Sequence, residues 1–206
     1  MSLSSESSPT QSRELVRELA TLIEEQQSII NRMNQACKSA LLCSQLELMK
    51  DMGGIDLHLD REYLASVVRH ESRKIAHQHD RDGDLYFDTM VETPSRVDEH
   101  HFACLLRELV DNAFRYSSQG SPVRVAWLNL DSGHRLIIRD EGKGMSDAYV
   151  NALNVGGPLS RLSISGLHIV MKIIELYGAK ISVMSEASQG TTFEVDFSDS
   201  PNNFYN

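Results

Sequence analysis

Residues 102–117, FACLLRELVDNAFRYS, are the stretch of sequence that decides the fold. The apolar residues recur with helical spacing and predict one buried face, made of Phe102, Leu105, Leu109 and Ala113. Glu108, Asn112 and Arg115 fall at positions i, i+4 and i+7, so they share a second, polar face of the same helix. The stretch therefore predicts a helix that packs on a core and presents a row of polar groups.

This polar row has the groups that a metal-bound triphosphate requires. Asn112 can offer its carboxamide oxygen to Mg²⁺, and Arg115 can bind phosphate oxygens. Glu108 can orient a water or accept a proton. The alternative is a solvated polar face without a ligand.

Three further motifs follow along the chain, and each has a plain turn or helix start as its alternative. Asp140-Glu-Gly142-Lys-Gly144-Met145 comes directly after a predicted strand. A carboxylate there can accept a hydrogen bond from an amino group such as that of adenine, and the glycines let the backbone turn tightly. Ser165-Gly166-Leu167 opens a helix whose free N–H groups suit phosphate, and Gly190-Thr191-Thr192-Phe193 enters the last strand.

Working outward, the patterns of capping residues, glycines and alternating apolar residues place the other elements. Helices are predicted at 60–77, 98–116, from 146 to the glycines at 156–157, and 165–177. Strands are predicted at 57–59, 84–91, 123–130, 135–139, 180–185 and 191–197, with turns at 131–134 and 188–190. This order predicts an α+β fold, a two-layer sandwich of a mixed, mostly antiparallel sheet with helices on one face, preceded by a long N-terminal helix.

The N-terminal part has a different character. Residues 1–12 are rich in serine and are predicted to be disordered or tag-derived. Residues 14–50 contain no Gly or Pro, and their apolar positions alternate three and four apart, starting from Leu15, Leu19 and Leu22. We interpret 13–52 as a helical dimerisation segment that forms a homodimer through residues 14–50. The alternative is one amphipathic helix packed on its own domain.

The composition and net charge argue against several functional classes of protein. The net charge of −9 argues against nucleic-acid binding, and it requires that a bound polyanion meet local positive charge, a helix N-terminus or a metal ion. No apolar run approaches the ~20 residues that span a membrane, so we expect no membrane segment in this chain. The three cysteines lack metal-type spacing and suggest buried thiols in a reducing cytoplasm.

Together the four motifs, in this order, resemble the histidine-kinase-like ATPases, which include DNA gyrase and heat-shock chaperone ATPases. The ending at 174–193 is most similar to sensor histidine kinases. The resemblance covers residues 53–198, followed by a tail at 199–206, and implies that this part binds ATP and Mg²⁺ and transfers the γ-phosphoryl group to a histidine. Partners would be a response regulator or an acceptor-histidine domain, and the localisation would be cytoplasmic.

Carried over residue by residue, the resemblance assigns the site. Asn112 would be the Mg²⁺ ligand, Glu108 the catalytic carboxylate, and Asp140 the adenine reader. Arg115 would contact phosphate, Tyr116 would lie against the nucleotide, and Thr191 would lie near the base. Gly142 and Gly144 would shape the pocket, and Gly166 and Leu167 would lie by the phosphates.

Two departures from the family pattern keep alternatives open. The family's glycines ahead of Gly166 are replaced by Ile164 and Leu162, and the loop between Leu153 and Ser165 that would form the ATP lid is short. The helix at 14–50 has no phosphoacceptor histidine, since all eight histidines lie at position 58 or later. The acceptor was either lost upstream or is naturally absent. Two alternative functions therefore stay open. One is a degenerate nucleotide-binding or scaffold module, and the other is a protein-serine kinase of the anti-sigma type.

Two other histidine-containing stretches favour structural roles. His70-Glu71 faintly resembles an acceptor motif but lacks the proline and lies inside the ATPase region. Residues 77–84, HQHDRDGD, have acidic spacing like a calcium loop, yet the glycine and the final carboxylate are misplaced. We interpret this second stretch as a polar turn from helix to strand.

Overall fold

The computed structural model describes residues 13–23, 26, 27, 30, 41, 42, 44, 45, 48, 63–155 and 165–198. The chain divides into two compact units, Met1–Leu41 and Leu42–Asn206. In the first unit, residues 13–23 form a helix. The predicted seam residues Leu15, Leu19 and Leu22 are 59%, 51% and 54% exposed there. The later seam positions, from 29 to 40, lie outside the described residues.

The second unit contains the helices and strands that the motifs require. In chain order they are α2 (Leu64–Gln78), the short 3-10 helix η1 (Asp82–Asp84), β1 (Leu85–Met90), α3 (Glu99–Tyr116), β2 (Val123–Leu130), β3 (Gly133–Asp140), α4 (Asp147–Val155), α5 (Ser165–Tyr177), β4 (Lys180–Glu186) and β5 (Gly190–Ser198). No helix among these described residues is both long and apolar enough to cross a bilayer.

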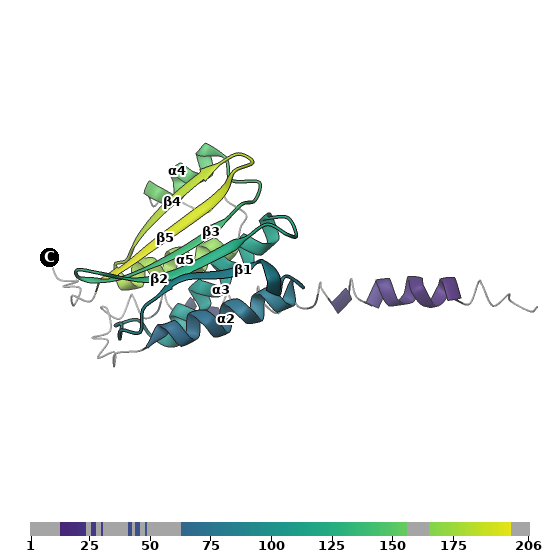
Figure 1. Cartoon of the computed structure of the whole chain (residues 1–206), viewed down its shortest axis with the longest axis horizontal. Helices are drawn as coiled ribbons and strands as arrows, with labels where there is room; N and C mark the ends of the chain where they lie inside the picture. Colours follow the sequence, from purple (N-terminus) through teal and green to yellow (C-terminus); the bar gives the residue numbers. More distant parts are fainter. Residues whose placement is uncertain are drawn as a thin grey trace, which may run out of the picture. The chain divides into compact units, whose positions relative to one another are not determined.

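The five strands form one sheet in the order β1-β2-β3-β5-β4. β1 runs parallel to β2, and the other neighbouring pairs are antiparallel. Figure 1 shows α2, α3 and α5 along one face of this sheet, with α4 beside β4 at its edge. The predicted α+β sandwich with a mixed, mostly antiparallel sheet and an N-terminal helix is confirmed.

The core lies between the sheet and α3. Asp98 caps α3 as predicted, because its Oδ1 accepts a hydrogen bond from the backbone N–H of His101 at 2.9 Å. The predicted core face of α3 is buried, and Phe102 packs edge-on against Trp127 of β2, with ring centroids 5.0 Å apart. The packing of Phe102 on Trp127 therefore fixes α3 against β2.

Two element boundaries were predicted wrongly. α2 begins at Leu64 after Tyr63, which makes no side-chain cap, instead of at an Asp60 cap. The buried residues of its first turns determine this start, and packing outweighs the capping signal. β3 begins at Gly133 instead of Arg135, so the hairpin loop shrinks to two residues. Gly133 has φ +155, and a Cβ there would lie 1.9 Å from the carbonyl oxygen of Phe197, so close strand pairing requires glycine. The predicted strand at 57–59 and the glycines at 156–157 lie outside the described residues.

The polar turn at 77–84 contains a buried arginine that organises this end of the fold. Arg81 is 6% exposed, and its guanidinium donates to the carbonyl oxygens of Phe114 and Ser121, both at 2.8 Å. Its Nε donates to Asp84 Oδ2 at 2.6 Å, and the same oxygen accepts from the N–H of Gly120 at 2.9 Å. Arg81 therefore ties the end of α3 to the start of β1 and to the loop before β2.

Candidate functional site

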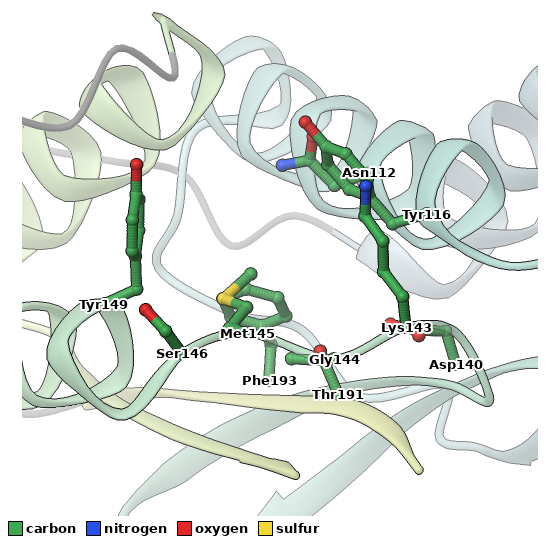
Figure 2. Close-up of a pocket in the computed structure, with 10 residues that line it drawn as sticks. All are labelled: Asn112, Tyr116, Asp140, Lys143, Gly144, Met145, Ser146, Tyr149, Thr191 and Phe193. Carbon is green, nitrogen blue, oxygen red and sulfur yellow. The ribbon is translucent and has the colours of Figure 1, made fainter. Parts of the chain in front are cut away.

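A cavity of about 300 Å³ opens between α3, the loop after β3, the start of α4 and β5. Figure 2 shows the ten residues that line it: Asn112, Tyr116, Asp140, Lys143, Gly144, Met145, Ser146, Tyr149, Thr191 and Phe193. They come from three stretches that are far apart in sequence, 112–116, 140–149 and 191–193. Five of them, Asn112, Tyr116, Asp140, Gly144 and Thr191, were predicted site residues.

Asp140 ends β3 at the inner end of this cavity and is 5% exposed. Its Oδ1 accepts a hydrogen bond from the N–H of Gly142 at 2.8 Å. Burial raises the pKa of the carboxyl, although hydrogen bonds from the backbone N–H groups of Gly142 and Thr191 oppose that rise. A carboxylate held this way can accept a further hydrogen bond from a buried amino donor.

Glycine is required where the loop turns behind Asp140. A Cβ at Gly142 would lie 2.3 Å from the carbonyl oxygen of Tyr116 and 2.7 Å from Asp140 Oδ1. Gly144 has φ +70, and a Cβ there would lie 2.2 Å from the carbonyl oxygen of Glu186. Both glycines therefore allow the loop to pack against its neighbours, as expected for residues that shape the pocket.

The β4–β5 hairpin contributes the wall beside Asp140, through Thr191 and Phe193 of β5. Thr191 pairs with Asp140 across the sheet, and its hydroxyl lies 2.9 Å from that of Ser185. Ser185 Oγ accepts from the N–H of Met145 at 2.8 Å and donates to the carbonyl oxygen of Gly190 at 2.9 Å. This network joins the hairpin to the loop after β3, so the cavity has rigid sides.

On the helix side, Asn112 is 5% exposed and lines the cavity. Its Nδ2 has no hydrogen-bond partner among the described residues. Buried carboxamides are nearly always hydrogen-bonded, and an orphan at a cavity wall indicates a group that a ligand completes. Tyr116, one turn further along α3, lies on the same wall.

The other five predicted residues do not line this cavity. Gly142 lies just behind it, and Leu167 is 3% exposed within the hydrophobic core. Gly166, at the start of α5, lies against Glu108, since a Cβ on it would be 2.2 Å from Glu108 Oε2. The lack of a side chain at Gly166 therefore leaves room for the Glu108 carboxylate. Ile164 and Leu162 lie outside the described residues.

Arg115 points to a different neighbour from the one expected. Its side chain is 52% exposed and pairs with Asp111, one helical turn earlier. Asp111 also contacts His79 Nε2 at 2.8 Å. The sequence analysis missed this pair, although Asp111 and Arg115 have the i, i+4 spacing at which opposite charges meet on a helix.

Sequence reasoning missed five lining residues: Lys143, Met145, Ser146, Tyr149 and Phe193. A signal existed for Phe193, which alternates with Thr191 along β5 and so shares its face. The others depend on the path of the loop after β3, which no periodicity predicts.

Comparison with known proteins identifies the family. The family described as histidine kinase-, DNA gyrase B- and HSP90-like ATPase matches residues 97–201. The chain belongs to this ATPase family. Membership implies an ATP-binding domain, and the cavity includes the Asp140 that the resemblance assigned to adenine. The sequence is 28% identical to the signal transduction histidine-protein kinase ArlS of Staphylococcus aureus, over 82% of this chain and 39% of ArlS.

Solved histidine kinases of this ATPase family have the same fold. The catalytic domain of histidine kinase ThkA superposes with a TM-score of 0.60 at 19% identity, covering 70% of this chain and 99% of that domain. Acinetobacter baumannii histidine kinase AdeS superposes with a TM-score of 0.59 at 19% identity, covering 95% of this chain and 87% of that one. The chain is thus a histidine-kinase-like ATPase catalytic domain with distant homology to sensor histidine kinases.

Proposed function

We propose that this chain is the ATP-binding catalytic part of a two-component sensor histidine kinase, acting in the cytoplasm and transferring the γ-phosphoryl group of ATP to a histidine. The observation that carries the proposal is a cavity lined both by the buried Asp140 carboxylate and by Asn112, whose amide nitrogen Nδ2 has no hydrogen-bond partner among the described residues. A purine amino group at Asp140 and a phosphate oxygen that accepts from Asn112 Nδ2 would satisfy both groups with one ligand, and the carboxamide oxygen of Asn112 would remain available for Mg²⁺.

The residues of the cavity suit an adenine nucleotide. Met145 and Phe193 supply apolar walls for a base, Asp140 accepts its amino group, and Thr191 lies beside that carboxylate. Tyr116 would lie against the nucleotide. Outside the cavity, Arg115, Gly166 and Leu167 remain proposed phosphate neighbours, and Glu108 the proposed catalytic carboxylate.

Calorimetric titration with ADP and ATP, with and without Mg²⁺, tests the proposal. Tight, Mg²⁺-dependent binding of ATP is expected. A chain that binds neither nucleotide would instead be a scaffold module. In a cell extract with γ-labelled ATP, acid-labile label on a partner would indicate transfer to histidine, whereas acid-stable label would indicate a serine kinase of the anti-sigma type.

Asn112 is predicted to matter only when metal is present. When bound, Mg²⁺ would bridge phosphate oxygens and neutralise their charge, with Asn112 among its oxygen ligands. Asn112→Ala should therefore weaken Mg²⁺-dependent binding of ADP while leaving metal-free binding nearly unchanged. Titrations of wild type and variant in Mg²⁺ and in EDTA check this. An equal loss in both would make Asn112 a structural residue.

A homodimer through residues 14–50 is the second prediction. The exposed leucines of the helix at 13–23 would be buried against a second copy, which removes an apolar stripe from water. Light scattering at high micromolar concentration should give twice the mass of the chain, and Leu19→Lys should shift it toward monomer. A monomeric wild type at that concentration would reject the dimer.

This chain by itself is predicted not to phosphorylate its own histidines. Transfer needs an acceptor imidazole that the γ-phosphate can reach in line, and residues 14–50 contain none. His70 is exposed on α2, within the ATP-binding unit. Incubation with γ-labelled ATP and Mg²⁺ should leave no acid-labile label on the chain. Label mapped to His70 would show that His70 is the acceptor.

A further inference from the structure

We infer that Lys143 is the side chain through which this pocket binds the phosphates of its nucleotide. The inference rests on the proposed function, because it concerns the polyphosphate part of the same ligand. Neither the motif reading nor the family resemblance assigns Lys143 any role, since it occupies the variable position between Gly142 and Gly144.

The backbone of Lys143 is held in place on both sides. Its N–H donates to the carbonyl oxygen of Tyr116 at 3.1 Å, and its carbonyl oxygen accepts from the N–H of Ser188 at 3.0 Å. The flanking glycines let the loop approach both partners closely. The loop is therefore pinned between α3 and the β4–β5 hairpin, and the direction in which the lysine leaves the backbone is set before any ligand arrives.

The ammonium group lies on the helix side of the cavity. Lys143 Nζ is 4.7 Å from the centre of the Tyr116 ring. Figure 2 shows the side chain extending from the loop beside Asp140 toward the wall that holds Asn112 and Tyr116. A nucleotide with its base at Asp140 would direct its phosphates toward that same wall. The Lys143 ammonium thus lies on the wall toward which those phosphates would extend.

The contact with Tyr116 can be exchanged for a stronger one. A cation–π contact at a partly exposed site contributes only about 0.5–1 kcal/mol. Hydrogen bonds from an ammonium to phosphate oxygens are charge-assisted and stronger. The ring therefore holds the ammonium near the proposed phosphate position, and this contact is weak enough for phosphate oxygens to replace it.

The charges in and around the cavity favour Lys143 over Arg115 as the cation that binds the phosphates. Among the ten cavity-lining residues of the described chain, Lys143 alone carries a positive charge. Arg115 is already neutralised by Asp111 and lies outside the cavity wall. In a chain with a net charge of −9, a polyanion needs a cation inside its own site to offset the surrounding repulsion.

A ligand series of increasing phosphate number tests the inference. Adenosine, ADP and ATP are titrated without Mg²⁺ into wild type and Lys143→Met. Lys143→Met should lower the affinities for ADP and ATP about tenfold while changing that for adenosine less than twofold, and Lys143→Arg should restore most of the loss. Arg115→Met should cost less than Lys143→Met, and Lys180→Met, on the exposed start of β4, should change nothing.

The outcomes separate this inference from the proposed function. If wild type binds ADP and Lys143→Met binds it equally well, the role of Lys143 is wrong and the nucleotide site stands. If the variant loses adenosine and ADP equally, Lys143 only shapes the pocket, and the inference is also wrong. If wild type binds none of the three ligands, both fail together.

Discussion

Replacement of Asp140 by Asn should weaken binding of ADP and ATP about tenfold or more. The carboxylate is 5% exposed, and its hydrogen bond to an adenine amino group would be made away from water. Such bonds to a charged acceptor contribute ~1.5–3 kcal/mol, which corresponds to a change in affinity of about tenfold or more. Isothermal titration of the wild type and Asp140→Asn with ADP measures the difference.

Two controls make this result interpretable. Asp131→Asn, in the exposed loop between β2 and β3, removes the same charge and should leave affinity unchanged. Asp140→Asn should remain folded, because asparagine keeps an oxygen that can accept the Gly142 N–H, and thermal unfolding checks this. An unchanged affinity in a folded Asp140→Asn variant would remove Asp140 from the adenine site.

The same carboxyl predicts a pH dependence. Burial holds the pKa of Asp140 above its ordinary value, so protonation begins at a higher pH than for an exposed aspartate. Because the ionised form is the acceptor, affinity for ADP should fall as the pH is lowered through this raised pKa. The stability of the fold should depend on pH in the opposite direction. Because the folded-state pKa of Asp140 is raised, its contribution to the free energy of unfolding is present below the unfolded-state pKa and is lost as the pH rises through the folded-state pKa. Asp140→Asn should flatten the binding profile.

Replacement of Arg81 by Ala should produce the largest loss of stability. Its guanidinium is buried, pairs with Asp84 and satisfies carbonyl oxygens of Phe114 and Ser121. Removing it leaves these groups unpaired, and breaking a buried pair costs about 3–5 kcal/mol. Arg81→Lys should also destabilise, because an ammonium cannot reproduce the planar fork of donors. Urea unfolding monitored by Trp127 fluorescence measures the change.

An exposed ion pair supplies the matched control. Arg69 and Glu92 lie 2.6 Å apart with side chains 36% and 59% exposed, so Arg69→Ala should change stability by less than about 1 kcal/mol. The hydrogen bond from Arg81, followed by that from the Gly120 N–H, holds the pKa of Asp84 below its usual value. This lowered pKa contributes stability that is lost as the pH falls through it, and Arg81→Ala should remove most of that acid dependence. Similar losses for Arg69→Ala and Arg81→Ala would contradict the assigned role of Arg81.

Local sequence patterns were sufficient for the architecture and the family. The apolar spacing and Asp98 cap of α3 predicted its span because both act within one or two turns of chain. The alternation of apolar residues predicted the strands β2 and β3, since a strand exposes alternate residues to one face. Asp140 and Asn112 could be selected as site residues from sequence alone. Each lies in a short motif, and the order of the motifs along the chain resembles that of the ATPase family.

The tertiary structure decided which groups meet. The path of the loop after β3, which no periodicity predicts, makes Lys143 the cation in the cavity. Arg81 lies in a stretch that was compared with a calcium loop, and two of its partners, Phe114 and Ser121, are more than thirty residues away in sequence. Periodicity specifies the face on which a residue lies, whereas its partner depends on which other element packs against that face. Long-range contacts between the loop, the hairpin and the helix therefore determined the positive charge inside the pocket. Long-range contacts likewise determined the carbonyl partners of the buried Arg81.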